Sequence, residues 1–143
     1  MAARQTLGDL FNLGTSETTN KVRVKLKNTT GCYVIALTAT SGAMTINECN
    51  AASAGTEQLV GGGGSGVALV YYTQNNGVWT KNTGSGSQVT CATGGLLACF
   101  VPSVLLASGF NYLDATHASA HILYMLVELQ GSRDPANLVD VRA

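Results

Sequence analysis

Charged residues are scarce in this chain. Only 11% of its 143 residues are charged, and the formal net charge is +0. Binding to nucleic acid depends on neutralising many phosphates, so this charge balance argues against nucleic acid as a partner. A protein with so little charge also has little electrostatic protection against association. The composition therefore suits a molecule that works inside an assembly.

Long apolar runs and targeting segments are also lacking. No stretch approaches the roughly 18 uninterrupted apolar residues that a membrane-spanning helix needs, and the opening MAARQTLGDLFNLG has no apolar core of the signal-peptide kind. We therefore expect no membrane partner and synthesis in a reducing host cytoplasm.

The cysteines show no metal-binding or redox spacing. Cys32, Cys49, Cys91 and Cys99 form no CxxC pair and no finger-type pattern. We interpret all four as small buried hydrophobic side chains. A disulfide between Cys91 and Cys99 is the alternative.

Catalytic motifs are lacking as well. No serine lies in a GxSxG context, and the eight carboxylates are spread singly along the chain. Without neighbouring carboxylates there is no pair whose proton affinities could be driven apart for acid–base work. We expect no catalytic residues, no cofactor and no enzyme activity.

The run GGGGSG at residues 61–66 raises the question of a phosphate-binding loop. Gly61 and Gly66 have the glycine spacing of such a loop, but Val67 and Ala68 stand where lysine and serine or threonine are required. A β-type segment follows, so no helix N-terminus would face an anion. A flexible linker fits the composition, but the flanks are too short to be separate domains. We predict a surface loop or glycine bend between strands.

A possible metal set lies further along. Asp114, His117 and His121 fall at i, i+3 and i+7, so one helical face could present a carboxylate and two imidazoles, which can ligate zinc or iron. The alternative is a helix cap followed by two polar side chains, and on that interpretation we expect no metal.

Strand patterns dominate the rest of the sequence. In KVRVKLK, Val22, Val24 and Leu26 alternate with a basic row, which holds four of the eight basic residues: Lys21, Arg23, Lys25 and Lys27. This row either protects an edge strand from pairing or meets an acidic partner. QNNG at residues 74–77 predicts a tight hairpin turn, because Asn-Gly tolerates the positive φ values of type I′.

The C-terminal third predicts a helix at about residues 115–130. Asp114 or Thr116 can cap it, Gly131 stands at its end, and apolar residues recur at helical spacing: Ala118, Ile122, Met125, Leu126 and Leu129. The fold class expected is α+β: mainly antiparallel β (sandwich or barrel-like) with one C-terminal helix. Residues 1–20 are expected to be an extended N-terminal arm, and residues 21–143 a single β-rich domain.

The passage GFNYLDATHASAHILYMLVELQGSRDPANLVDV resembles the ends of capsid decoration (cement) proteins of tailed bacteriophages. In that family an apolar helix precedes a turn with arginine, a proline and an Asn-Leu pair. The basic row at residues 21–27 has no counterpart there. The resemblance implies a structural virion protein on the outer capsid surface. Such proteins add as homotrimers and stabilise the shell against the pressure of packaged DNA.

This resemblance implies two partners, the major capsid protein and further copies of the chain. We assign capsid contact to an N-terminal apolar cluster and to the basic row: Leu7, Leu10, Phe11, Arg23, Lys25 and Lys27. We assign the subunit interface to the C-terminal third: Ile122, Leu123, Tyr124, Leu126, Arg133 and Leu138.

Other functions remain open. The chain could be another virion building block, such as a tail-tube or head-completion subunit. It could instead be a glycan- or receptor-binding β module that uses Tyr71, Tyr72 and Trp79. A metal-dependent hydrolase is the most distant alternative.

Overall fold

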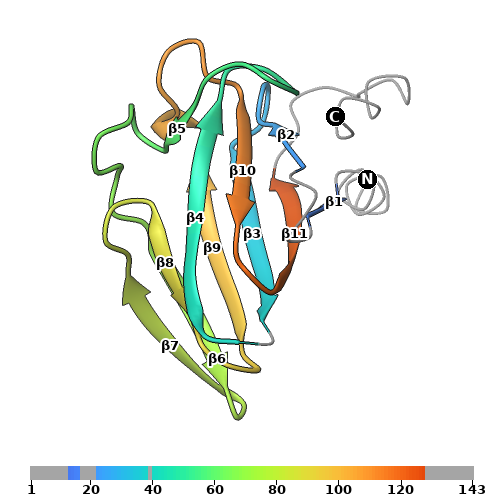
Figure 1. Cartoon of the computed structure of the whole chain (residues 1–143), viewed down its shortest axis with the longest axis vertical. Helices are drawn as coiled ribbons and strands as arrows, with labels where there is room; N and C mark the ends of the chain where they lie inside the picture. Colours follow the sequence, from blue (N-terminus) through green and yellow to red (C-terminus); the bar gives the residue numbers. More distant parts are fainter. Residues whose placement is uncertain (1–12, 17–21, 39, 128–143) are drawn as a thin grey trace.

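A computed structural model describes residues 13–16, 22–38 and 40–127 of the chain. Two antiparallel sheets pack face to face, and β4 and β10 of one sheet lie in front of β9 and β3 of the other (Figure 1). The first sheet has six strands in the order β1 (Leu13–Ser16), β11 (Ala120–Val127), β3 (Gly31–Thr38), β9 (Leu96–Pro102), β6 (Val70–Asn75) and β7 (Val78–Thr83).

The second sheet has five strands. Its order is β2 (Val24–Lys25), β10 (Tyr112–Thr116), β4 (Gly42–Cys49) and β5 (Glu57–Leu59), and β8 (Gln88–Cys91) also pairs with β4. One short 3₁₀ turn, η1 (Ser103–Leu105), follows β9. Every pairing between these strands is antiparallel. The expected β-sandwich is therefore correct in its strands.

The expected C-terminal helix is wrong, and with it the α+β class. Described residues 112–116 and 120–127 form β10 and β11 instead. In β11, Ala120, Ile122, Tyr124 and Leu126 face the core while the residues between them face outward. Because both sets are largely apolar, the segment satisfies a period of two as well as a helical period. Pairing on both sides, with β1 and β3, decides in favour of the strand.

The core lies between the two sheets. Its largest fully buried side chains come from both of them and include Met44, Ile46, Leu97, Leu113 and Tyr124. The Tyr124 hydroxyl reaches from β11 to β10, where it accepts a hydrogen bond from the N–H of Ala115 at 2.8 Å. A buried phenol needs such a partner, and this bond links the two sheets.

The glycine run is a loop, as predicted. Residues 60–69 connect β5 to β6, and Gly61 and Gly62 adopt φ values of +97° and +96°, which side chains rarely allow. The carboxylate of the fully buried Glu48 accepts hydrogen bonds from their N–H groups and from that of Ala107. The loop is therefore held by a buried carboxylate, and it serves the architecture.

The structure also tests the predicted hairpin turn, the predicted strand at residues 21–27 and the predicted N-terminal arm. Asn76 and Gly77 join β6 to β7 with φ values of +50° and +80°, which confirms the type I′ hairpin. The strand expected at residues 21–27 is shorter, since only Val24–Lys25 pairs. Within the expected arm, Leu13–Ser16 forms β1 and pairs with β11, whereas Leu7, Leu10 and Phe11 lie outside the described residues.

Candidate functional site

A cluster of polar side chains lies on the outward side of the five-stranded sheet. Its members alternate with core residues along their strands: Asp114 lies between Leu113 and Ala115, and Asn47 and Cys49 flank Glu48. The strand register places Asp114 opposite Asn47, and Glu57 opposite Cys49. Arg23 precedes β2, next to β10. Outward positions are normally solvated, yet Asn47, Cys49 and Asp114 are buried.

Hydrogen bonds connect this polar cluster, defined as Arg23, Asn47, Cys49, Glu57 and Asp114. Arg23 Nη2 lies 3.1 Å from Glu57 Oε2, and Arg23 Nε lies 3.4 Å from Asp114 Oδ2. Asn47 Nδ2 donates to Glu57 Oε1 at 2.8 Å and to Asp114 Oδ1 at 3.2 Å. The Cys49 thiol donates to Asp114 Oδ2 at 3.3 Å. All four carboxylate oxygens therefore accept hydrogen bonds from within the cluster.

The segment between β4 and β5 is hydrogen-bonded to the cluster. Arg23 Nη1 donates to the carbonyl of Ala51 at 3.1 Å and to the carbonyl of Ala54. Asn50 closes the same segment, because its side-chain oxygen accepts from the N–H of Thr56 at 2.9 Å. The guanidinium thus joins both carboxylates to the loop above them, and the side chain of Arg23 is only 11% exposed.

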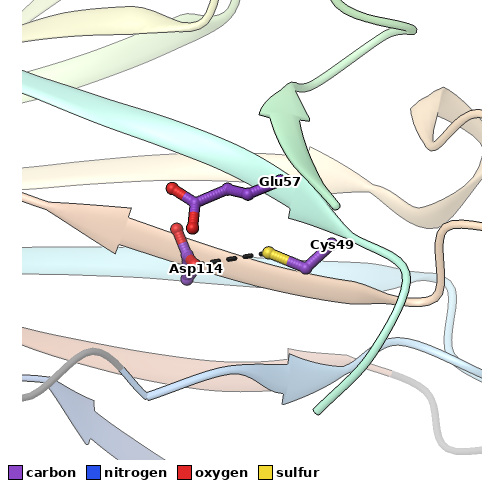
Figure 2. Close-up of side chains that lie close together, drawn as sticks. All are labelled: Cys49, Glu57 and Asp114. Carbon is purple, nitrogen blue, oxygen red and sulfur yellow. Dashed lines mark hydrogen bonds between the residues drawn. The ribbon is translucent and has the colours of Figure 1, made fainter. Parts of the chain in front are cut away.

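The cluster contains a possible metal-ligand set. Among the described residues, only Cys49, Glu57 and Asp114 bring three ligand atoms within 4.8 Å of one another, and these side chains point toward one another in Figure 2. A metal would need a thiolate and free carboxylate lone pairs. Burial, and then the negative charge of Asp114, raise the pKa of the Cys49 thiol well above its ordinary value. All four carboxylate oxygens of the set accept hydrogen bonds from Arg23, Asn47 and Cys49, so the observed contacts are those of an internal hydrogen-bond network.

The metal candidates taken from helical spacing are not brought together. Asp114 belongs to the polar cluster, and His117 lies in the turn after β10, where its Nδ1 accepts from the N–H of Ser119 at 3.1 Å. His121 lies on β11 in the other sheet, and its side chain is exposed. The spacing i, i+3, i+7 collects side chains only on a helix, and this segment is two strands and a turn.

The outward side of the six-stranded sheet carries mainly apolar side chains, unlike the outward side of the five-stranded sheet. Its central row crosses five strands and reads Leu123, Ile35, Ala98, Tyr72, Lys81. A second row joins Met125, Tyr33 and Phe100, and the rings of Tyr33 and Phe100 have centroids 4.9 Å apart. A third row reads His121, Leu37, Leu96, Gln74, Trp79.

We call this surface the outer apolar face and define it by its apolar members: Tyr33, Ile35, Leu37, Val70, Tyr72, Leu96, Ala98, Phe100, Leu123, Met125 and Val127. All are exposed or half-buried, and Leu37 and Tyr72 keep 57% and 45% of their surface. Across the outward rows of β3, β6, β7, β9 and β11, Lys81 is the single lysine, arginine or carboxylate. Contiguous apolar surfaces of this kind mark contacts with other molecules.

The residues predicted for the subunit interface do not all lie on the same side of β11. Ile122, Tyr124 and Leu126 are core residues, so they cannot contact another subunit, because strand alternation turns them inward. Leu123 does lie on the outer apolar face. Arg133 and Leu138 lie outside the described residues. Sequence reasoning missed the rest of the face, although apolar residues at successive positions in CYVIALT and AHILYMLV indicated strands apolar on both sides.

The basic residues predicted for capsid contact also lie in different environments. Arg23 lies on the same outward side as Lys25, but its guanidinium is bonded within the polar cluster and is only 11% exposed. Lys27 is exposed, and the Nζ of Lys25 lies 5.8 Å from the ring centroid of Tyr112. Of the aromatic residues considered for glycan binding, Tyr71 is buried, whereas Tyr72 and Trp79 are exposed.

All four cysteines are buried and free, which confirms them as small buried side chains and excludes the disulfide between Cys91 and Cys99. Within the described part of the chain, no helix is long and apolar enough to span a membrane. No protein-family model, curated protein sequence or solved structure matches this chain.

Proposed function

We propose that this protein is a structural subunit that works by binding other proteins. The observation that carries this proposal is the contrast between its two outer surfaces: the polar cluster is buried and satisfied internally, whereas the outer apolar face is open to solvent. An open sheet face with one flanking lysine gains free energy only when another surface covers it.

Catalysis is not part of the proposal. The polar cluster is the closest grouping of carboxylates and thiol among the described residues, and each of its carboxylate oxygens already accepts a hydrogen bond. Burial raises the pKa of its thiol, which disfavours the thiolate that a nucleophile needs. We therefore assign these groups to stabilising the fold.

The assembly that we propose is a virion, with the chain on the outside of a phage capsid. The resemblance of its C-terminal third suggests this role, although the helical part of that resemblance is corrected by β10 and β11. The low charge and the outer apolar face support a protein held among other subunits. Its partners would be the major capsid protein and further copies of itself, and its contacts would stabilise the shell against internal DNA pressure.

Lys25 and Lys27 offer the surface for the shell. They lie at β2 in the five-stranded sheet, and the outer apolar face belongs to the other sheet. Cationic side chains speed and orient binding to an acidic partner. A subunit with one apolar and one basic surface could therefore contact its own copies and the capsid at the same time.

Co-sedimentation with capsids tests the proposal. Heads of the virus that encodes this chain, prepared without it, should bind the purified protein until their sites are saturated. Lys27→Glu should weaken this binding about tenfold at low salt, while Val104→Glu, which adds a negative charge on η1 outside the strands of both surfaces, should leave it unchanged. Wild-type protein that remains in the supernatant at every concentration would exclude the capsid role. Rings or tubes seen by electron microscopy would favour a tail-tube or head-completion subunit.

Glycan binding is the second candidate, because Tyr72 and Trp79 are 45% and 49% exposed on one side of the β6–β7 hairpin. Gln74 lies opposite Trp79 and could donate hydrogen bonds to a sugar. Binding on a glycan array that Trp79→Ala abolishes would support this function over the structural one.

A further inference from the structure

We propose that the outer apolar face is covered by the same face of a second copy of this chain, so that the protein is a two-fold dimer. This inference rests on the proposed function, since it takes the chain to be an assembly subunit. It names the partner of the outer apolar face and the symmetry of the contact.

The charges of the face favour an identical partner. Its three rows contain one lysine, Lys81, at the β7 end of the central row, and one histidine, His121, at the β11 end of the third row. A partner surface with ordinary charge density would have to bury unpaired charges against these rows, which is costly. The same face of another copy buries apolar surface against apolar surface, and Lys81 and His121 stay at the ends of their rows.

The form of the face also suits a two-fold contact. Its centre is the pair Ile35 and Ala98, directly opposite each other on β3 and β9, and five further side chains surround them: Tyr33, Leu37, Tyr72, Phe100 and Leu123. A large and a small residue at the centre allow Ile35 of one copy to pack on Ala98 of the other. In a two-fold interface each residue contact occurs twice, so this exchange would be made on both sides of the axis.

The size of the face sets the expected strength of the contact. Four strands about 4.8 Å apart, each contributing roughly 20 Å of length, give a flat area of about 400 Å² per copy. Two such faces remove about 800 Å² from water, which is below the roughly 1,200 Å² of stable interfaces and in the range of weak, reversible association. We therefore expect association that depends on protein concentration.

The rest of the described fold leaves this face open. The five-stranded sheet packs on the inner side of β3, β9 and β11, where Val34, Leu97 and Tyr124 are fully buried. On the outer side Leu37 and Tyr72 are exposed, and the other members of the face are at least partly exposed. A face-to-face pair would give the outer side the layer that the inner side already has.

The test measures mass by sedimentation equilibrium over a wide range of concentrations. The wild-type protein should approach about 29 kDa, twice the chain mass of 14.7 kDa. Ala98→Lys puts a charge at the centre of the contact on both copies, and it should raise the dissociation constant at least about 100-fold. Leu37→Lys, at a position 57% exposed in the monomer, should act in the same direction without threatening the fold.

Val104→Lys is the matched control. Val104 is 85% exposed in η1, outside the strands of the face, so this variant should dimerise like wild type. Circular dichroism confirms that each variant is folded before its mass is compared.

The outcomes separate this inference from the proposed function. A mass of 14.7 kDa at all concentrations overturns the dimer, and so does a trimer of the kind that the family resemblance implies. If the monomer still binds capsids and Leu37→Lys abolishes that binding, the capsid protein occupies the face and the structural role stands. A dimer that Val104→Lys weakens as much as Ala98→Lys also overturns the inference.

Discussion

Asp114 of β10 and Leu37 of β3 both point outward from their sheets, yet Asp114 is fully buried and Leu37 is 57% exposed. The usual arrangement of a sandwich is the reverse, with carboxylates in water and leucines covered. In the five-stranded sheet, the polar cluster is largely buried and its carboxylates accept hydrogen bonds from Arg23 and Asn47. In the six-stranded sheet, Leu37 and Tyr72 of the outer apolar face are exposed. The chain therefore buries polar groups on one outward side and exposes apolar groups on the other.

The largest expected loss of stability comes from a change in the polar cluster. Asp114→Ala removes a carboxylate that accepts from Arg23, Asn47 and Cys49. Arg23 then keeps its charge in a largely buried place with one partner fewer, so we expect a loss of about 3–5 kcal/mol in the free energy of unfolding. Urea denaturation measures it. Thr116→Ala, two residues further on the same side of β10, should cost less than about 1 kcal/mol. Equal losses for Asp114→Ala and Thr116→Ala would show that the polar cluster does not stabilise the fold.

A smaller loss is expected on the inner side of the same sheet. Glu48→Ala leaves the N–H groups of Gly61, Gly62 and Ala107 without their acceptor. No buried charge remains behind, so we expect a loss of about 2–3 kcal/mol in the free energy of unfolding. Gln58→Ala removes one donor to the same carboxylate and should cost about 1 kcal/mol. Faster amide hydrogen exchange in the glycine loop should accompany Glu48→Ala and not Gln58→Ala.

Alkaline pH should weaken the protein through its buried thiols. Burial raises the pKa of Cys91 from 9.0 to about 11, and those of Cys32 and Cys99 to about 12. Below pH 9 these thiols are protonated in both states. Above it the unfolded chain loses protons while the folded chain keeps them, so stability falls by about 1.4 kcal/mol per pH unit for each thiol.

Urea denaturation at pH 8, 9 and 10 tests this slope. Cys91→Ala should make the fall between pH 9 and 10 shallower by the contribution of one thiol, whatever other groups titrate in that range. If wild type and Cys91→Ala fall with the same slope, the thiol of Cys91 is not shielded from solvent as the structure indicates.

The smallest change in the free energy of unfolding should come from a substitution on the outer apolar face. Leu37→Thr changes a side chain that the monomer leaves largely in water, so its free energy of unfolding should stay within about 0.5 kcal/mol of wild type in dilute solution. Leu97→Ala, on the inner side of β9, should cost about 2–5 kcal/mol. A large loss for Leu37→Thr would mean that the outer apolar face is already covered within one chain.

Much of the fold was predictable because its patterns are local. The alternation of Val22, Val24 and Leu26 and the turn at Asn76 and Gly77 each lie within a few residues. The helix prediction failed because apolar residues at nearly every position of 120–127 fit two periods equally well. Only pairing with β3, about 90 residues away in sequence, separates them.

The polar cluster was beyond prediction for the same physical reason. Arg23 meets Glu57 and Asp114, which lie 34 and 91 residues along the chain. Its place in a basic row suggested solvent, and only the folded sheet shows that its guanidinium bonds to two carboxylates and two carbonyl groups. The outer apolar face was not predicted, because the interface assignment of Leu123 rested on a helix that is a strand in the structure.

Covalent footprinting of side chains at two protein concentrations tests the central comparison most directly. A photogenerated carbene labels exposed side chains, and mass spectrometry locates the label. We predict that Leu37, Tyr72 and Leu123 are labelled in dilute protein and protected in concentrated protein, while Cys49 and Asp114 are protected in both. Equal labelling of the outer apolar face at the two concentrations, or labelling of the polar cluster in folded protein, would contradict this account.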